Sequence, residues 1–165
     1  MDPDRADAQR VADLIAVQEG RSPVPLLDDA EIATVLRAAR RIAVVGASPR
    51  PFRPSNGVFH ALRRAGYDVV PVNPDADEID GVACYPTVVA AVEATGPVDI
   101  VDVFRRPIAC PDVARDAAAA GARCLWLQLG IVSLEAGRIA HAGGLSVVMD
   151  RCTSIELHRL RIHES

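Results

Sequence analysis

The chain has 165 residues, of which 50% are hydrophobic and 24% charged, as expected of one globular domain with its own core. Its formal net charge of -4 excludes the basic surface typical of nucleic-acid-binding proteins, and no apolar run approaches the roughly 20 residues that a membrane-spanning helix needs. Because the charged first residues, MDPDRADAQR, do not open a secretory signal, we expect a cytoplasmic protein.

Two helices joined by a linker are predicted before the first strand. The first covers residues 1–20, and Pro23 and Pro25 exclude a helix in the linker 21–25. The second begins at Asp28, which has Glu31 at the spacing of a capping box. We therefore divide the chain into an N-terminal helical extension, 1–40, and a main domain, 41–165. The extension could bind a protein partner or a second copy of the chain.

Apolar strands alternate with amphipathic helices in the main domain. Strands are predicted at 42–46, 68–72, 98–104, 123–128 and 145–149, helices at 55–65, 87–94, 111–120, 133–142 and 153–161, and a possible short strand within 81–85. Several strands are near-continuous apolar runs, which is typical of parallel sheets covered on both faces. The pattern predicts an α/β, Rossmann-like, doubly wound and mostly parallel sheet of about five strands with helices on both faces.

Ligands of such sheets bind beyond the carboxyl ends of the strands, so the residues after each strand are the candidate site. The first strand ends in Gly46, Ala47 and Ser48, and a loop with Arg53 leads to a helix that begins near Ser55. Free backbone N–H groups and the helix dipole favour a phosphate at such a turn. We expect the side chain of Ser55, or that of the next residue, Asn56, to cap the helix; the alternative for this segment is an ordinary turn with a cap.

The later strand ends carry groups that suit a nucleotide. Asn73 and Pro74 could place an amide near a ribose or base, and Phe104 could stack on adenine while Arg105 meets a phosphate. Gln128 and Gly130 could line a channel with amide and backbone groups. The alternative for each of these segments is an ordinary surface turn.

Side-chain chemistry narrows the possible functions. The chain has no lysine, so a Schiff base is excluded and any cationic side chain on a phosphate must be arginine or protonated histidine. The cysteines Cys84, Cys110, Cys124 and Cys152 have neither C-x-x-C nor zinc-ligand spacing, so we expect reduced, structural thiols and no metal site. No histidine follows a strand, and no catalytic residues are predicted.

Five segments resemble a known family in order and spacing: VVGASPRPFRPSNGV, GYDVVPVNP, VDIVDVFRRP, LWLQLG and VVMDRC. The family is that of small single-domain CoA-binding proteins, related to the CoA-binding domain of the succinyl-CoA synthetase alpha subunit. The resemblance implies a Rossmann-like domain that binds coenzyme A or an acyl-CoA. It implies that the phosphates contact Gly46, Ala47, Ser48, Arg53 and Ser55, and that the nucleotide lies near Asn73 and Pro74. It further implies that Phe104, Arg105 and Pro107 flank the adenosine or the pantetheine, and that Gln128 and Gly130 lie nearest the thiol-bearing arm.

The chain departs from the synthetases because it ends where their ligase half, with its phosphorylated histidine, would begin. We therefore expect a non-catalytic or regulatory binding module. An NADP-binding oxidoreductase-like protein is the first alternative. The missing G-x-G-x-x-G and the absence of an acidic residue at Asn73-Pro74 argue against NAD, whereas Arg50 could accept a 2′-phosphate. A scaffold subunit of a larger complex is the second alternative.

Overall fold

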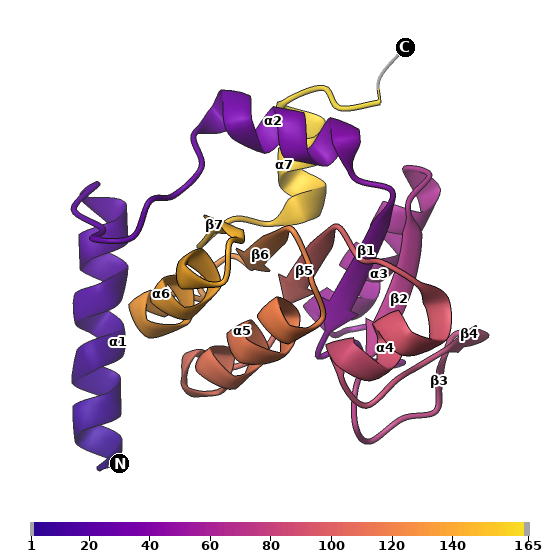
Figure 1. Cartoon of the computed structure of the whole chain (residues 1–165), viewed down its shortest axis with the longest axis horizontal. Helices are drawn as coiled ribbons and strands as arrows, with labels where there is room; N and C mark the ends of the chain where they lie inside the picture. The colour runs from indigo at the N-terminus through magenta and orange to yellow at the C-terminus, as the bar shows by residue number, and fades with distance from the viewer. Residues whose placement is uncertain (1, 164–165) are drawn as a thin grey trace.

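A five-stranded parallel sheet forms the centre of the molecule (Figure 1). The computed structural model describes residues 2–163. The sheet has the order β2-β1-β5-β6-β7, from strands β1 (Arg41–Val45), β2 (Asp68–Val72), β5 (Ile100–Val103), β6 (Cys124–Leu127) and β7 (Ser146–Val148), all paired in parallel. The chain steps outward from β1 to β2, then returns past β1 to β5 and continues in the opposite direction. The predicted doubly wound fold is confirmed, with its topological switch point between β1 and β5.

Helices cover both faces of this sheet (Figure 1). One face is covered by α2 (Asp29–Ala38), α3 (Pro54–Arg64) and α7 (Thr153–Arg159), and the other by α4 (Val88–Thr95), α5 (Cys110–Ala119) and α6 (Leu134–Ala142). In β1, Ile42 and Val44 pack into the core under α2, α3 and α7, whereas Ala43 and Val45 pack into the core under α4, α5 and α6. Burial on both sides explains why the strands consist of continuous apolar runs.

The helix α2 shares the core of the sheet. Ile32 and Leu36 are completely buried in it. The predicted capping box is present, because Glu31 N donates to Asp28 Oδ1 at 2.8 Å and Asp28 N donates to Glu31 Oε1 at 3.1 Å. The division of the chain at residue 40 stays a prediction, but α2 contributes to the same core as β1.

The helix α1 (Pro3–Gln18) lies beside α6 at the edge of the molecule (Figure 1). It leaves Val11 and Ile15 exposed. Its buried Asp13 accepts a hydrogen bond from the backbone N–H of Leu134, the first residue of α6, at 3.0 Å. One buried carboxylate therefore connects α1 to the start of a core helix.

A short antiparallel hairpin after β2 is the one part of the sheet structure that the sequence did not resolve. It consists of β3 (Glu78–Ile79) and β4 (Val82–Ala83), where only a possible strand was predicted. Asp80 and Gly81 form its turn with φ of 48° and 84°, the left-handed pair that tight hairpins favour. The 3-10 turn η1 (Pro107–Ala109) was also not predicted. Elsewhere the predicted bounds that fall within residues 2–163 differ by at most two residues, and residue 1 of the first predicted helix lies outside the described residues.

Within residues 2–163, no helix combines the length and apolar character that crossing a bilayer requires. The same residues contain no group of three or more His, Cys, Asp or Glu side chains arranged to hold a metal ion.

Candidate functional site

A cleft of about 810 Å³ lies at the carboxyl ends of β1, β2, β5 and β6, which is a size typical of small-molecule sites. It includes the switch point of the sheet, where ligands of doubly wound folds bind. The structure brings many of the predicted site residues together on its wall: Gly46, Ala47, Ser48, Arg53, Ser55, Asn73, Phe104 and Gln128. These residues come from different strand ends, so the fold creates the predicted grouping.

Gly46 brings the first turn close to the end of β5. Its φ is 84°, and a Cβ at this position would lie only 2.8 Å from the carbonyl oxygen of Phe104. Gly46 N donates to Val72 O at 2.9 Å, and Phe104 N donates to Val45 O at 2.8 Å, so the ends of three strands are joined here. Only glycine combines this backbone conformation with this approach.

Asn73 fixes the end of β2 against the same turn. Its side-chain Nδ2 donates to Ala47 O at 2.8 Å, and its Oδ1 accepts from Asp75 N at 2.8 Å. The amide that was predicted to face a nucleotide is therefore engaged in shaping the cleft. As a result Asp75 and Ala76 also line the cleft.

The N-terminus of α3 opens onto the cleft without a side-chain cap. Arg53 is the N-cap residue and makes no side-chain capping bond. The prediction that Ser55 or Asn56 caps this helix is wrong, because Pro54 takes the first helical position and places both residues inside the helix. Asn56 instead donates from Nδ2 to Ser48 O at 2.8 Å, which holds the turn against α3.

Two arginines and one carboxylate give the cleft its charge. Arg50 and Arg53 line it from the β1–α3 loop, and Asp75 lines it from the end of β2. Arg50 N also donates to Ser48 Oγ at 3.1 Å, which tightens the turn. Backbone N–H groups, a helix N-terminus and guanidinium groups together suit an anionic ligand group such as phosphate.

Gln128 belongs to a buried network beneath the cleft. Its Nε2 donates to Asp102 Oδ1 at 2.6 Å and to Thr153 Oγ1 at 2.9 Å, and Thr153 Oγ1 donates to Asp102 Oδ2 at 2.9 Å. Burial raises the pKa of Asp102 to about 7, although the hydrogen bonds from Gln128 and Thr153 act in the opposite direction. The network ties β5, β6 and α7 together directly under the cleft.

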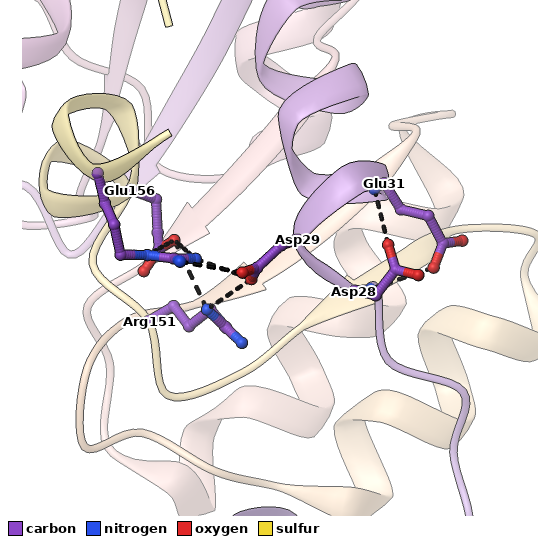
Figure 2. A network of polar contacts seen from close by, with 6 residues as sticks. Asp28, Asp29, Glu31, Arg151 and Glu156 are labelled. Atoms are coloured by element: carbon purple, nitrogen blue, oxygen red, sulfur yellow. Dashed lines mark hydrogen bonds and ion pairs between the residues drawn. The ribbon is translucent and has the colours of Figure 1, made fainter. Parts of the chain in front are cut away.

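The loop before α7 forms another wall and is held by an ion-pair network, shown in Figure 2. Arg151 Nη1 donates to Asp29 Oδ1 at 3.3 Å and lies 3.6 Å from Glu156 Oε2. Its backbone carbonyl accepts from Trp126 Nε1 at 2.7 Å. The next residue, Cys152, faces the cleft. Arg151 therefore pairs with Asp29 of α2, and the neighbouring Asp150 accepts from Gly130 N instead.

Four predicted site residues lie off the cleft wall. Arg105 is close to it, because its Cδ would be 3.3 Å from a Cβ on Gly46. Pro74 is exposed beside the cleft, and Gly130 N is bound to Asp150 Oδ1 at 2.7 Å. Pro107 lines a separate hollow of about 110 Å³ beside α1. Their contact with a ligand stays a prediction.

The cleft also contains residues that were not among the predicted coenzyme A contacts: Pro49, Arg50, Pro54, Val58, Asp75, Ala76, Leu129, Ile131, Cys152 and Ile155. Of these, Arg50 was considered only as a possible contact to the 2′-phosphate of NADP. Seven of the ten lie within two positions of a predicted residue, so widening each strand-end segment by two positions would have found them. Val58, Cys152 and Ile155 are different, because they lie on α3, before α7 and on α7, where the contribution to the cleft depends on tertiary packing.

The four cysteines are free, as expected. Burial raises the pKa of the Cys110 and Cys124 thiols to about 12, and it also raises that of Cys84. Cys152 is the one that is not fully buried. The three buried thiols act as small apolar side chains in the core.

The fold and the cleft define a doubly wound α/β domain with a cleft at its switch point. A family model described as "CoA binding domain" matches residues 40–158. The chain therefore belongs to the CoA-binding domain family, and the resemblance seen in the sequence is confirmed. A relative in Bacillus subtilis (strain 168), the "Uncharacterized protein YneT", is 43% identical over 126 residues, which are 76% of this chain and 91% of the relative.

Solved structures share the fold. A hypothetical protein from Pyrococcus horikoshii OT3 has a TM-score of 0.77 and 37% identity, covering 82% of this chain and 93% of that one. The dinucleotide-forming acetyl-coenzyme A synthetase 1 of Ca. Korarchaeum cryptofilum has a TM-score of 0.62 and 28% identity, covering 72% of this chain but 28% of the synthetase. This chain thus corresponds to only a part of that synthetase.

Proposed function

We propose that this protein binds coenzyme A or an acyl-CoA in the cleft at the strand ends, as a non-catalytic or regulatory module. The observation that supports this most directly is the β1–α3 turn. It combines the close approach at Gly46, an uncapped helix N-terminus and two arginines, Arg50 and Arg53, on one wall. Membership of the CoA-binding domain family supports the same ligand.

The ligand's charge fits this turn. Coenzyme A carries a diphosphate and a 3′-phosphate, and a diphosphate over Ser48 would receive backbone N–H groups and the positive end of the α3 dipole. Arg53 stands at the first turn of that helix, so its guanidinium can reach the same phosphates. Phe104, on the β5 side of the turn, offers an aromatic surface to the remainder of the ligand.

A titration calorimetry series tests this assignment. We expect coenzyme A to bind, and Arg53→Gln to weaken binding by roughly tenfold or more, the usual cost of losing a hydrogen bond to a charged group. Arg64→Gln, at the exposed opposite end of α3, is the matched control and should bind like the original protein. If Arg53→Gln bound coenzyme A as tightly as Arg64→Gln, the phosphates would not bind at this turn.

The non-catalytic role needs its own test. Acetyl-CoA incubated with the protein should release no thiol beyond the buffer rate, as measured with a thiol-reactive chromophore after removal of the protein. Release of more than one equivalent of thiol per chain would show catalytic turnover of the thioester and overturn this part of the proposal.

One observation favours a second candidate, a dinucleotide. Asp75 lines the cleft two residues after Asn73, and an acidic side chain after the second strand holds a ribose hydroxyl in many doubly wound domains. Its negative charge would favour a free ribose diol, as in NAD, over the 2′-phosphate of NADP. Titration with NAD and NADP beside coenzyme A separates the two candidates, since binding of NAD with no response to coenzyme A would select the dinucleotide.

A further inference from the structure

The wall of the cleft is divided between polar and apolar side chains. Ser48, Arg50, Arg53, Asn73 and Asp75 line it from the β1–α3 loop and the end of β2, whereas Leu129, Ile131 and Ile155 line it from the segment after β6 and from α7. In the sheet order β2-β1-β5-β6-β7, the end of β2 and the end of β6 lie on opposite sides of the switch point. The charged side chains of the cleft therefore lie on one side, called the polar side, and Leu129, Ile131 and Ile155 lie on the other, called the apolar side. Pro49, Pro54 and Val58 also line the polar side, and Gln128 and Cys152 also line the apolar side.

Two of the apolar side chains are unusually open to solvent. Leu129 is 63% exposed and Ile155 is 53% exposed. Exposed apolar side chains that gather on the wall of a cleft commonly mark the surface that contacts a ligand. Both side chains are purely aliphatic, so neither can form a hydrogen bond with a ligand.

The loop and helix that carry these residues are firmly placed. Arg159, on the same helix as Ile155, donates to Asp29 at 2.8 Å and 2.9 Å (Figure 2 shows the network), while Gln128, the residue before Leu129, is fixed by Asp102 and Thr153. The apolar side of the cleft is thus a prepared surface, and little conformational order has to be gained when it is covered.

We propose that this apolar side binds the acyl group of an acyl-CoA, so that the physiological ligand is a thioester with an aliphatic chain of several carbons and not free coenzyme A. This inference rests on the proposed function, because it places the phosphates on the polar side at Gly46 and Arg53. The pantetheine arm then crosses the end of β5, past Phe104, and brings the thioester toward Leu129 and Ile155. The acyl chain is the longest uninterrupted aliphatic part of such a ligand, because the methyl and methylene groups of pantetheine are separated by amides and a hydroxyl.

Calorimetric titration of the full chain with coenzyme A and with hexanoyl-CoA tests this assignment. Each buried methylene is worth roughly fourfold in affinity, so partial burial of the chain should make hexanoyl-CoA bind at least about tenfold more tightly. The double variant Leu129→Gln and Ile155→Gln should bring this ratio close to one. Ile108→Gln is the same type of substitution at a side chain that is 68% exposed and away from the cleft, and this variant should retain the preference for hexanoyl-CoA.

The outcomes separate this inference from the proposed function. Binding of both ligands with equal affinity, or a tenfold preference that persists in the double variant, would overturn the acyl site and leave coenzyme A binding intact. Failure of both ligands to bind the original protein would overturn the proposed function and the acyl site with it. A dimer that the double variant dissociates in sedimentation velocity, with no change in the ratio, would assign these side chains to contact with a second copy and overturn the acyl site.

Discussion

Arg159 holds Asp29 through two parallel hydrogen bonds, from Nη1 to Oδ2 at 2.9 Å and from Nη2 to Oδ1 at 2.8 Å, across 130 residues of sequence. The pair joins α2 to α7 on one face of the sheet, and Arg151 adds a third contact to the same carboxylate. Since Cys152 and Ile155 line the cleft beside this network, the pair also fixes one of its walls. The ion pair between Arg159 and Asp29 is exposed, but it helps to position the segment that lines the cleft.

Neutralising Asp29 should therefore destabilise the protein in a way that depends on pH and salt. The hydrogen bond from Arg159 is the main reason that the pKa of Asp29 lies below its ordinary value. A lowered carboxyl pKa contributes stability above about pH 4, and that contribution is lost as the pH falls through the folded-state pKa. Asp29→Asn should thus lower the Tm at neutral pH and low salt, and have less effect in acid or in high salt.

Thermal unfolding checks this expectation, and Asp112→Asn is the control. The side chain of Asp112 is 91% exposed and forms an ion pair with Arg115, three residues further along the same helix. A double-mutant cycle with Arg159→Gln separates the pair from the favourable position of Asp29 at the start of α2. A coupling of zero in the cycle would contradict the structural role.

Gly46→Ala should both destabilise the protein and weaken ligand binding. The left-handed backbone and the approach to Phe104 O predict a loss of about 1–3 kcal/mol in the free energy of unfolding. Gly57→Ala is the matched control, because Gly57 lies in α3 with open space around its Cα, and alanine should add about 0.5–1 kcal/mol there. Urea unfolding of both variants measures the difference, and equal stabilities would refute the close approach.

Removing the Asp13 side chain should show how much α1 contributes to the fold. Asp13 accepts from Leu134 N and from Gln9 Nε2, at 3.0 Å and 2.7 Å, and it is buried. Asp13→Ala should cost about 1–2 kcal/mol, the usual cost of losing a helix cap. Asp13→Asn keeps an oxygen acceptor and should recover most of the loss in denaturant unfolding. Similar losses in the two variants would mean that the capping bond contributes little.

Asp102 should make stability depend on pH in the direction opposite to Asp29. Its pKa is raised from 3.8 to about 7, so the unfolded chain ionises first as the pH rises through this range. The neutral carboxyl of Asp102 therefore contributes fully to the free energy of unfolding below about pH 4. This contribution, on the order of 4 kcal/mol in total, is lost by about pH 7. Asp102→Asn, of the same shape, removes the ionisation.

Denaturant unfolding of the two proteins at a series of pH values tests this. The original protein should lose stability relative to Asp102→Asn between about pH 4 and pH 7 and show no further relative change above that range. A difference that stays constant over the whole range would show that Asp102 does not titrate between the two states.

The sequence predicted the strand ends well because each parallel strand is a short apolar run with an abrupt polar end. Gly46, Asn73 and Gln128 follow directly from that pattern, and the structure brings all three to one cleft. What it could not show was how their side chains are used. Asn73 and Gln128 offer the same amide to a ligand or to the protein, and here both donate to neighbouring protein groups.

Other parts of the site depend on contacts between distant segments. Asp102 lies in an apolar strand, and nothing in its neighbours indicates a buried carboxyl bound by Thr153, 51 residues away. The wrong prediction of the α3 cap has a local cause, because Pro54 shifts the start of the helix ahead of Ser55. Ile155 required knowledge of where α7 packs.

The partial exposure of Cys152 also makes the protein convenient for spectroscopy. With Cys84, Cys110 and Cys124 buried in the core, a maleimide dye should label the native protein at this one position without any engineered cysteine. Because Cys152 lines the cleft, the emission of such a dye would change when the cleft is filled. A compound collection could then be screened by fluorescence in a microplate, with the change in emission of the attached dye on adding a compound as the readout.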